Sequence, residues 1–111
     1  TDGWYEWKKS NTSEKHPFYF HKGGKLIYMA GIFNKIGCVI VTKSASPDIA
    51  NIHHRQPVLL NKLGRRHWIK GLVLRSDHFY NDIDSHRVGN FVNSPKFNEY
   101  TCIAPLPGSP L

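Results

Sequence analysis

The stretch GWYEWKK, residues 3–9, alternates aromatic and charged side chains near the start of the chain. Such alternation predicts a β-strand that shows different side chains to its two faces. Glu6 then shares one face with Trp4, while Tyr5 and Trp7 lie on the other. The polar segment that follows, SNTSEKH, is typical of a loop. The strand therefore carries several aromatic rings and one carboxylate.

Further strands are expected in the next part of the chain. The segment PFYFHKGGKLIYMAGIF, residues 17–33, has two β-prone runs on either side of Gly23 and Gly24, which predicts a hairpin. GCVIVTKSA, residues 37–45, is a continuous apolar run rich in β-branched residues, which is typical of a buried strand. The first 45 residues thus predict four strands.

The middle of the chain carries signals for two short helices. Ser46 can cap a helix that has Pro47 at its first position. Pro57 disfavours helical backbone at the residue before it, so residues 53–55 are expected at a helix end or in the turn before a strand over PVLL. A second, amphipathic helix is predicted over NKLGRRHWIKGL, residues 61–72.

The remainder predicts turns over residues 76–85, a last strand over residues 86–94 and an irregular tail. Strands dominate, so the predicted class is α+β. A length of 111 residues suits one domain. No stretch approaches the roughly 20 apolar residues of a membrane helix, so we expect a soluble protein without a membrane partner.

The charge and the cysteines narrow the choice of partner and compartment. The net charge is +7 with histidine neutral, which favours a polyanion, although general surface charge is an equal alternative. Cys38 and Cys102 both have apolar neighbours, so buried free thiols in a reducing compartment are expected rather than a disulfide.

Glu6 is the first candidate for chemistry. A carboxylate beside an indole loses solvation, which raises its pKa toward that of a useful general acid or base. The plainer alternative is a solvated residue at a sheet edge. Tyr5 and Trp7 could stack on nucleobases, but packing in a core is the commoner role of such rings.

The second candidate is the pair His53 and His54, followed by Arg55. Adjacent histidines cannot both face one pocket, so one is expected to point inward. Histidine suits proton transfer near neutral pH, and the guanidinium matches phosphate; a helix-end histidine bonded to backbone is the alternative. The histidines lack metal-ligand spacing and no Gly-rich phosphate loop occurs, so neither metal nor cofactor is expected.

Three ordered stretches together resemble one family: DGWYEWKK, VIVTKSASPDIANIHHRQPVLL and HRVGNFVNSPKFNEYTCIAPL. They are similar to the SRAP family, the SOS response-associated peptidases that process abasic DNA. The resemblance runs over residues 2–106. It implies a β-barrel-like core with a few short helices, with residues 1–106 forming the C-terminal half of a single domain and residues 107–111 an irregular tail.

The resemblance also implies an activity. Members bind single-stranded DNA and link covalently to abasic sites through an N-terminal cysteine, whose amine and thiol close a thiazolidine on the sugar aldehyde. Self-cleaving peptidase activity and a lyase side activity are implied as well. The catalytic glutamate falls on Glu6 and the catalytic histidine on His53, whereas DNA contacts fall on Trp7, Thr42 and Arg55.

The resemblance leaves some requirements unmet by this chain. The nucleophilic cysteine belongs to an N-terminal half that is expected to come from outside these residues, and neither Cys38 nor Cys102 can replace it. Gln56 stands where relatives have Met or Arg, which is expected to alter packing only. The expected partner is abasic single-stranded DNA, bound by a monomer in the cytoplasm and nucleoid, or in the nucleus of a eukaryote.

Two other functions remain open at this level. One is a non-catalytic module that binds single-stranded nucleic acid, which would bind in a salt-sensitive way and ignore abasic lesions. The other is a metal-dependent nuclease that uses His53, His54 and His86.

Overall fold

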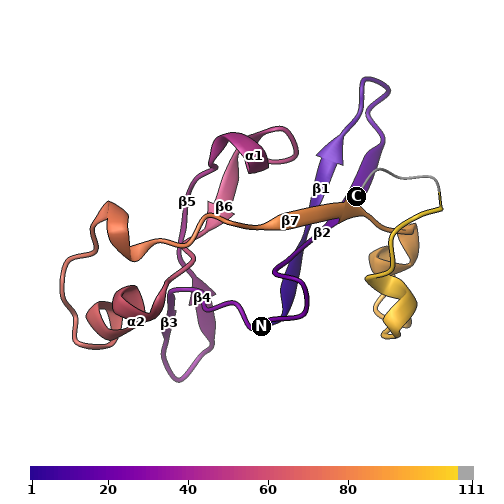
Figure 1. Cartoon of the computed structure of the whole chain (residues 1–111). Helices are drawn as coiled ribbons and strands as arrows, with labels where there is room; N and C mark the ends of the chain where they lie inside the picture. Colours follow the sequence, from indigo (N-terminus) through magenta and orange to yellow (C-terminus); the bar gives the residue numbers. More distant parts are fainter. Residues whose placement is uncertain (108–111) are drawn as a thin grey trace.

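The computed structural model describes residues 1–107, which form short strands and helices with strands in the majority (Figure 1). The strands are β1 (Gly3–Lys9), β2 (Lys15–His21), β3 (Gly31–Phe33), β4 (Cys38–Ile40), β5 (Thr42–Ser44), β6 (Arg55–Pro57) and β7 (Asp84–Arg87). The α-helices are α1 (Pro47–Ala50) and α2 (Lys62–Ile69), and the 3-10 helices are η1 (Ser76–His78), η2 (Asn90–Asn93) and η3 (Tyr100–Cys102).

The largest sheet has the order β1-β2-β7 and is antiparallel. Aromatic pairs hold β1 against β2: Trp4 stacks on Phe20 with ring centroids 4.9 Å apart, and Tyr5 lies 5.3 Å from Tyr19. Cross-strand pairs of this kind are a main source of sheet stability. Their register sets Glu6 opposite Phe18 in the middle of the strand pair.

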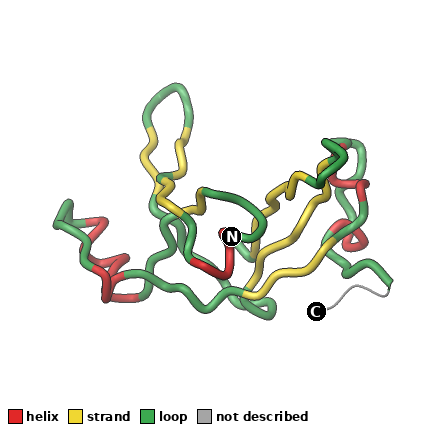
Figure 2. The backbone as a smooth tube through the Cα atoms, turned by 90° about the horizontal axis from the view of Figure 1, so that it is seen from above, coloured by secondary structure: helices red, strands yellow, loops and turns green. Residues whose placement is uncertain are grey.

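Two smaller sheets, β3-β4 and β5-β6, are separate from the first (Figure 2). The sheets of the described residues do not close into a barrel, so the mixed strand-and-helix class is found but the barrel-like core is not confirmed. A buried cluster of Ala30, Val58 and Leu60 joins the smaller sheets to α2, whose Trp68 packs against it. Trp68 also donates its indole N–H to the carbonyl of Gly31.

The hairpin predicted around Gly23 and Gly24 is wrong. Both glycines have positive φ, but β2 pairs with β1 on one side and β7 on the other. The segment after the turn instead makes a bridge between Met29 and Leu59. A turn signal reports local backbone only, whereas the partner of β2 is chosen by aromatic packing with β1.

The continuous buried strand predicted over residues 37–45 is also wrong. The segment divides into β4 and β5, and Val39 in β4 is 68% exposed. The apolar side chains of the β3-β4 hairpin are largely exposed, with Ile32 at 60% and Phe33 at 84%. Cys38 is consequently exposed rather than buried, whereas Cys102 is buried as expected, and both thiols are free.

The two helices begin close to where the sequence predicts. Helix α1 starts at Pro47, but the Ser46 side chain makes no capping hydrogen bond. The backbone N–H of Ser46 donates instead to the side-chain oxygen of the buried Gln56 at 2.7 Å. Gln56 is thus buried and holds the start of α1 through a hydrogen bond. Helix α2 is capped by Asn61, whose side-chain oxygen accepts the N–H of Gly64 at 2.8 Å.

The C-terminal part departs further from expectation. The last strand, β7, covers residues 84–87 rather than 86–94, because the chain turns into η2 after Gly89. The turns expected over residues 76–85 include η1. Of the predicted tail, residues 108–111 lie outside the described residues. None of the described helices has the length and apolar character needed to traverse a bilayer.

Gly64→Ala is expected to destabilise the protein by about 1 to 3 kcal/mol, because a methyl group there would overlap the backbone carbonyl of His78. Helix propensity alone predicts the opposite sign, since alanine is favoured over glycine by roughly 1 kcal/mol. Urea unfolding measures the change. The control Gly37→Ala, with open space around its Cβ, should stay within about 0.5 kcal/mol. A stability gain in Gly64→Ala would contradict this close packing.

Candidate active site

Glu6 and His53, which are far apart in the sequence, lie together at the edge of the largest sheet. The distance from Glu6 Oε2 to His53 Nε2 is 3.7 Å, and the two side chains are 22% and 33% exposed. They line an open cavity of about 480 Å³, together with Trp7, Lys15 and Asn93. The pair is therefore partly desolvated but still open to a substrate.

The backbone around each group explains its position. Glu6 is held by the register of β1 on β2, whereas His53 follows α1, where its N–H donates to the carbonyl of the buried Ile49 at 3.0 Å. Helix α1 ends at Ala50, and Pro57 favours extended backbone at the residue before it, so the chain turns into β6. This turn directs the imidazole toward β1.

The His53 ring is supported by Arg55 in either protonation state. When Nδ1 carries no proton, it accepts the backbone N–H of Arg55 at 3.2 Å. When Nδ1 is protonated, it can donate to the backbone carbonyl of Arg55 at 3.1 Å. Nε2, the atom that faces Glu6, is thus free to gain or lose a proton while the ring keeps a partner. This arrangement suits a proton shuttle.

Burial raises the pKa of Glu6, while the nearby His53 and, to a smaller extent, His54 lower it. The net direction is upward, because desolvation of the charged form outweighs the attraction to the imidazoles. The folded state therefore holds this proton more tightly than the unfolded state. The contribution of Glu6 to stability is largest at acid pH and is lost as the pH rises through the folded pKa.

His54 occupies a different environment from His53. Its ring stacks on the His53 ring with centroids 4.7 Å apart, but it is exposed and does not line the cavity. The two rings thus lie side by side, but only His53 lines the cavity. His53 is the one that reaches the carboxylate.

Of the other candidate residues, Trp7 lines the cavity, whereas Thr42 and Arg55 do not belong to its lining. Trp7 donates its indole N–H to the side-chain oxygen of Asn93 at 2.8 Å, which fixes the ring beside Glu6. Arg55 donates from its guanidinium to the Thr42 hydroxyl at 3.1 Å, and both residues are exposed on neighbouring strands. The structure thus brings an aromatic ring into the cavity with the acid and imidazole, and it places the Arg55 guanidinium against Thr42.

Lys15 and Asn93 line the cavity but were not singled out from the sequence. Lys15 belongs to β2 at the end of the hairpin, and Asn93 ends η2. Both reach the site through long-range packing. No local pattern in the sequence identifies them.

His86, which one alternative placed with His53 and His54, lies elsewhere. Its Nε2 is 2.6 Å from the carbonyl of Ile103, and its Nδ1 is 3.2 Å from Nε2 of His21. The backbone N–H of Gly23 in turn donates to Nδ1 of His21 at 3.0 Å. The described residues contain no group of three or more His, Cys, Asp or Glu side chains placed to hold a metal ion.

His53→Gln is expected to raise the pKa of Glu6 further, because it removes the imidazole charge that lowers this pKa most. A carbon-detected NMR titration of the Glu6 carboxyl measures the shift. His54→Gln is the control and should raise the same pKa by a smaller amount, since His54 is the weaker of the two influences. A Glu6 pKa that falls in His53→Gln would show that the two groups do not interact as the geometry indicates.

Comparison with known proteins places this site in context. The chain is 35% identical over 78 residues to the abasic site processing protein YedK of Escherichia coli, which covers 62% of this chain and 35% of YedK. It is 27% identical over 115 residues to the abasic site processing protein YoqW of Bacillus subtilis, covering 87% of this chain and 51% of the relative. The match to the abasic site processing protein HMCES of Gallus gallus covers 95% of this chain at 27% identity.

The chain thus spans about half, or less, of the length of these relatives, with 42% of HMCES covered. The family model for SOS response associated peptidase (SRAP) matches residues 1–95. That match includes β1 with Glu6 and the turn with His53. The chain belongs to the SRAP family.

Proposed function

We propose that this chain supplies the acid and the imidazole of a site that processes abasic sites in single-stranded DNA. The observation that carries the proposal is the approach of Glu6 to His53, at 3.7 Å, in a cavity open to solvent. The relatives named as abasic site processing proteins and the net charge of +7 support it. Glu6 and His53 are the residues to which we assign catalysis.

The first task of the pair is to open the sugar. The closed abasic sugar is a hemiacetal, so opening requires one proton to leave its hydroxyl and another to reach the ring oxygen, which yields the aldehyde. His53 can move both protons through Nε2, because Arg55 supports the ring in each protonation state. General acid–base catalysis of this kind contributes about 100-fold to 10,000-fold to a rate.

The second task is to assist the covalent link. The amine of an N-terminal cysteine adds to the aldehyde, the adduct loses water to give an imine, and the thiol adds to the imine carbon to close a thiazolidine. Glu6, whose raised pKa favours a protonated form, can donate the proton that lets water leave. The cysteine comes from the N-terminal half of the domain, since thiazolidine closure requires the amine and thiol of one terminal residue.

The same groups account for two further activities. Glu6 can activate water for attack on the peptide bond that precedes the cysteine, and the proton it takes up can pass to the cysteine nitrogen, which leaves as the free amine. An imine at an abasic sugar also acidifies the neighbouring C–H, so β-elimination and strand scission follow as a lyase side reaction. Closure of the thiazolidine removes the imine and protects the strand.

The flanking residues give the site its affinity for a single strand. Trp7 offers an aromatic face for a base, and such stacking requires an unpaired strand whose bases are free to rotate outward. Arg55, oriented by Thr42, offers a forked donor to a phosphate. We place the protein as a monomer with cellular DNA, in the cytoplasm and nucleoid or in a nucleus.

In the whole protein, Glu6→Gln or His53→Gln is expected to slow adduct formation with an abasic single-stranded oligonucleotide by about 100-fold or more, because each removes a proton-transfer group. Denaturing gels that resolve the protein–DNA adduct over time measure the rate. Neither variant should weaken binding to an intact oligonucleotide to a similar degree.

Glu14→Gln and His54→Gln are the matched controls for that experiment. Glu14 is an exposed carboxylate in the hairpin loop, and His54 neighbours the proposed shuttle without lining the cavity. Both should react at close to the wild-type rate. Equal rates in all four variants, or binding that ignores the lesion with no adduct, would overturn the proposal in favour of a binding module.

Arg55→Gln tests the phosphate contact. Loss of one contact should weaken binding to every single-stranded sequence alike and make the dependence of log K on log salt shallower by about 0.7. Fluorescence anisotropy at several salt concentrations measures the slope. Arg75→Gln, an exposed arginine beside Asp77, is the control and should leave the slope unchanged. An unchanged slope in Arg55→Gln would remove Arg55 from the interface.

A further inference from the structure

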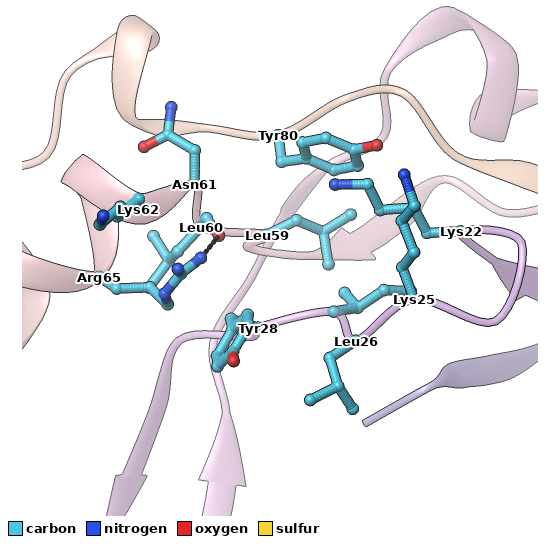
Figure 3. A pocket seen from close by; sticks show the side chains of 11 residues that line it. Lys22, Lys25, Leu26, Tyr28, Leu59, Leu60, Asn61, Lys62, Arg65 and Tyr80 are labelled. Carbon is cyan, nitrogen blue, oxygen red and sulfur yellow. Dashed lines mark hydrogen bonds between the residues drawn. The ribbon is translucent and has the colours of Figure 1, made fainter.

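A second cavity, of about 460 Å³, lies between the turn after β2 and the start of α2 (Figure 3). Lys22 and Lys25 reach it from the turn, and Lys62 and Arg65 reach it from the helix. Tyr28 and Tyr80 form part of its walls, and no carboxylate belongs to its lining. The cavity thus gathers four cationic side chains from segments that are distant in the sequence.

Two of the four cations are held in place by aromatic rings. The Lys22 ammonium lies 3.6 Å from the centroid of the Tyr80 ring, and the Arg65 guanidinium lies 3.9 Å from that of Tyr28. Arg65 also donates to the carbonyl of Leu60 at 3.4 Å. A cation over a ring keeps a fixed position while its charge stays available to a ligand.

The remaining two cations are exposed and uncompensated. Within residues 1–107, no salt bridge joins Lys25 or Lys62, or either of the ring-bound cations, to a carboxylate. Like charges that converge without a counter-charge repel one another, so the arrangement is stabilised when an anion enters. The floor of the cavity is apolar, with Leu59 buried beneath it, which lowers the local dielectric and strengthens that attraction.

The charge of this second cavity determines which class of ligand it can bind. Four cations exclude a metal ion or an organic cation, and a single carboxylate would satisfy only part of the set. A phosphate group offers several acceptor oxygens, which match the fork of Arg65 and the ammonium groups of the lysines. We propose that this cavity binds the phosphate groups of a nucleic-acid strand, at a place separate from the Glu6–His53 cavity.

The two cavities lie at opposite ends of β2. Lys15, the first residue of β2, lines the Glu6–His53 cavity. Lys22, the residue after the end of β2, lines the second cavity. A strand of seven residues spans roughly 20 Å. The second site therefore holds a portion of the strand away from the reacting sugar, and it rests on its own charge and shape rather than on the chemistry of Glu6 and His53.

The test replaces the two exposed lysines in the whole protein. Lys25→Gln with Lys62→Gln should make the slope of log K against log salt for an intact single-stranded oligonucleotide shallower by about 1.4, because two phosphate contacts are lost at about 0.7 each. Fluorescence anisotropy gives the slope. In a second arm, calorimetric titration with tripolyphosphate asks whether free phosphate compounds occupy the same cavity.

A matched pair and a rescue complete the design. Lys35→Gln with Lys70→Gln removes the same charge from exposed positions outside both cavities and should leave slope and tripolyphosphate binding unchanged. Lys25→Arg with Lys62→Arg should retain the wild-type slope. A shallower salt slope for the oligonucleotide in Lys25→Gln with Lys62→Gln identifies a nucleic-acid strand as the ligand. An unchanged slope together with lost tripolyphosphate binding identifies a free phosphate compound instead.

The proposal is overturned if Lys25→Gln with Lys62→Gln leaves the salt slope for the oligonucleotide as unchanged as the matched pair does, whatever happens to tripolyphosphate binding. Adduct formation at saturating abasic oligonucleotide is recorded in parallel, and it should stay at the wild-type rate in the variants of this cavity. The failure of the second site and the failure of the proposed chemistry at Glu6 and His53 are thus distinguishable.

Discussion

The pairing of β1 with β2 through stacked aromatic rings is the constraint on which the proposed chemistry depends. Trp4 on Phe20 and Tyr5 against Tyr19 fix a single register, and this register decides which way Glu6 points. A slip by one residue would turn every side chain of the strand to the opposite face and move the carboxylate away from His53. The aromatic rings of β1 therefore serve mainly as a structural clamp, with Trp7 at its end left to face the cavity.

Local signals predicted the elements whose structure is decided locally. The helix start at Pro47, the helix start near residue 61 and the end of a helix before Pro57 are found close to where the sequence indicates, although the cap expected from the Ser46 side chain does not form. Sheet partners could not be predicted this way, because pairing depends on contacts between distant segments. The glycine pair at 23–24 marks a turn correctly but says nothing of what the flanking segments pair with, and the apolar run at Val39 carries no information on whether another element covers it.

The candidate site also combines residues that a local motif identifies with residues that only long-range folding brings in. Residue types alone do not connect Glu6 with His53, whereas the family resemblance does. The structure then brings them to 3.7 Å. Lys15 and Asn93 complete the cavity lining, yet neither stands in a motif, because their presence follows from how the hairpin and η2 fold back on β1. A site assembled from four separate segments is visible only after folding.

The row of contacts from Gly23 through His21 and His86 to Ile103 has a fixed direction. The carbonyl of Ile103 can only accept, so His86 must donate from Nε2, His21 must donate to the next ring, and Gly23 must donate to His21. This order holds only while both rings are neutral. Each ring therefore keeps one tautomer, because the other tautomer of either ring would set two N–H groups against each other at one of these contacts.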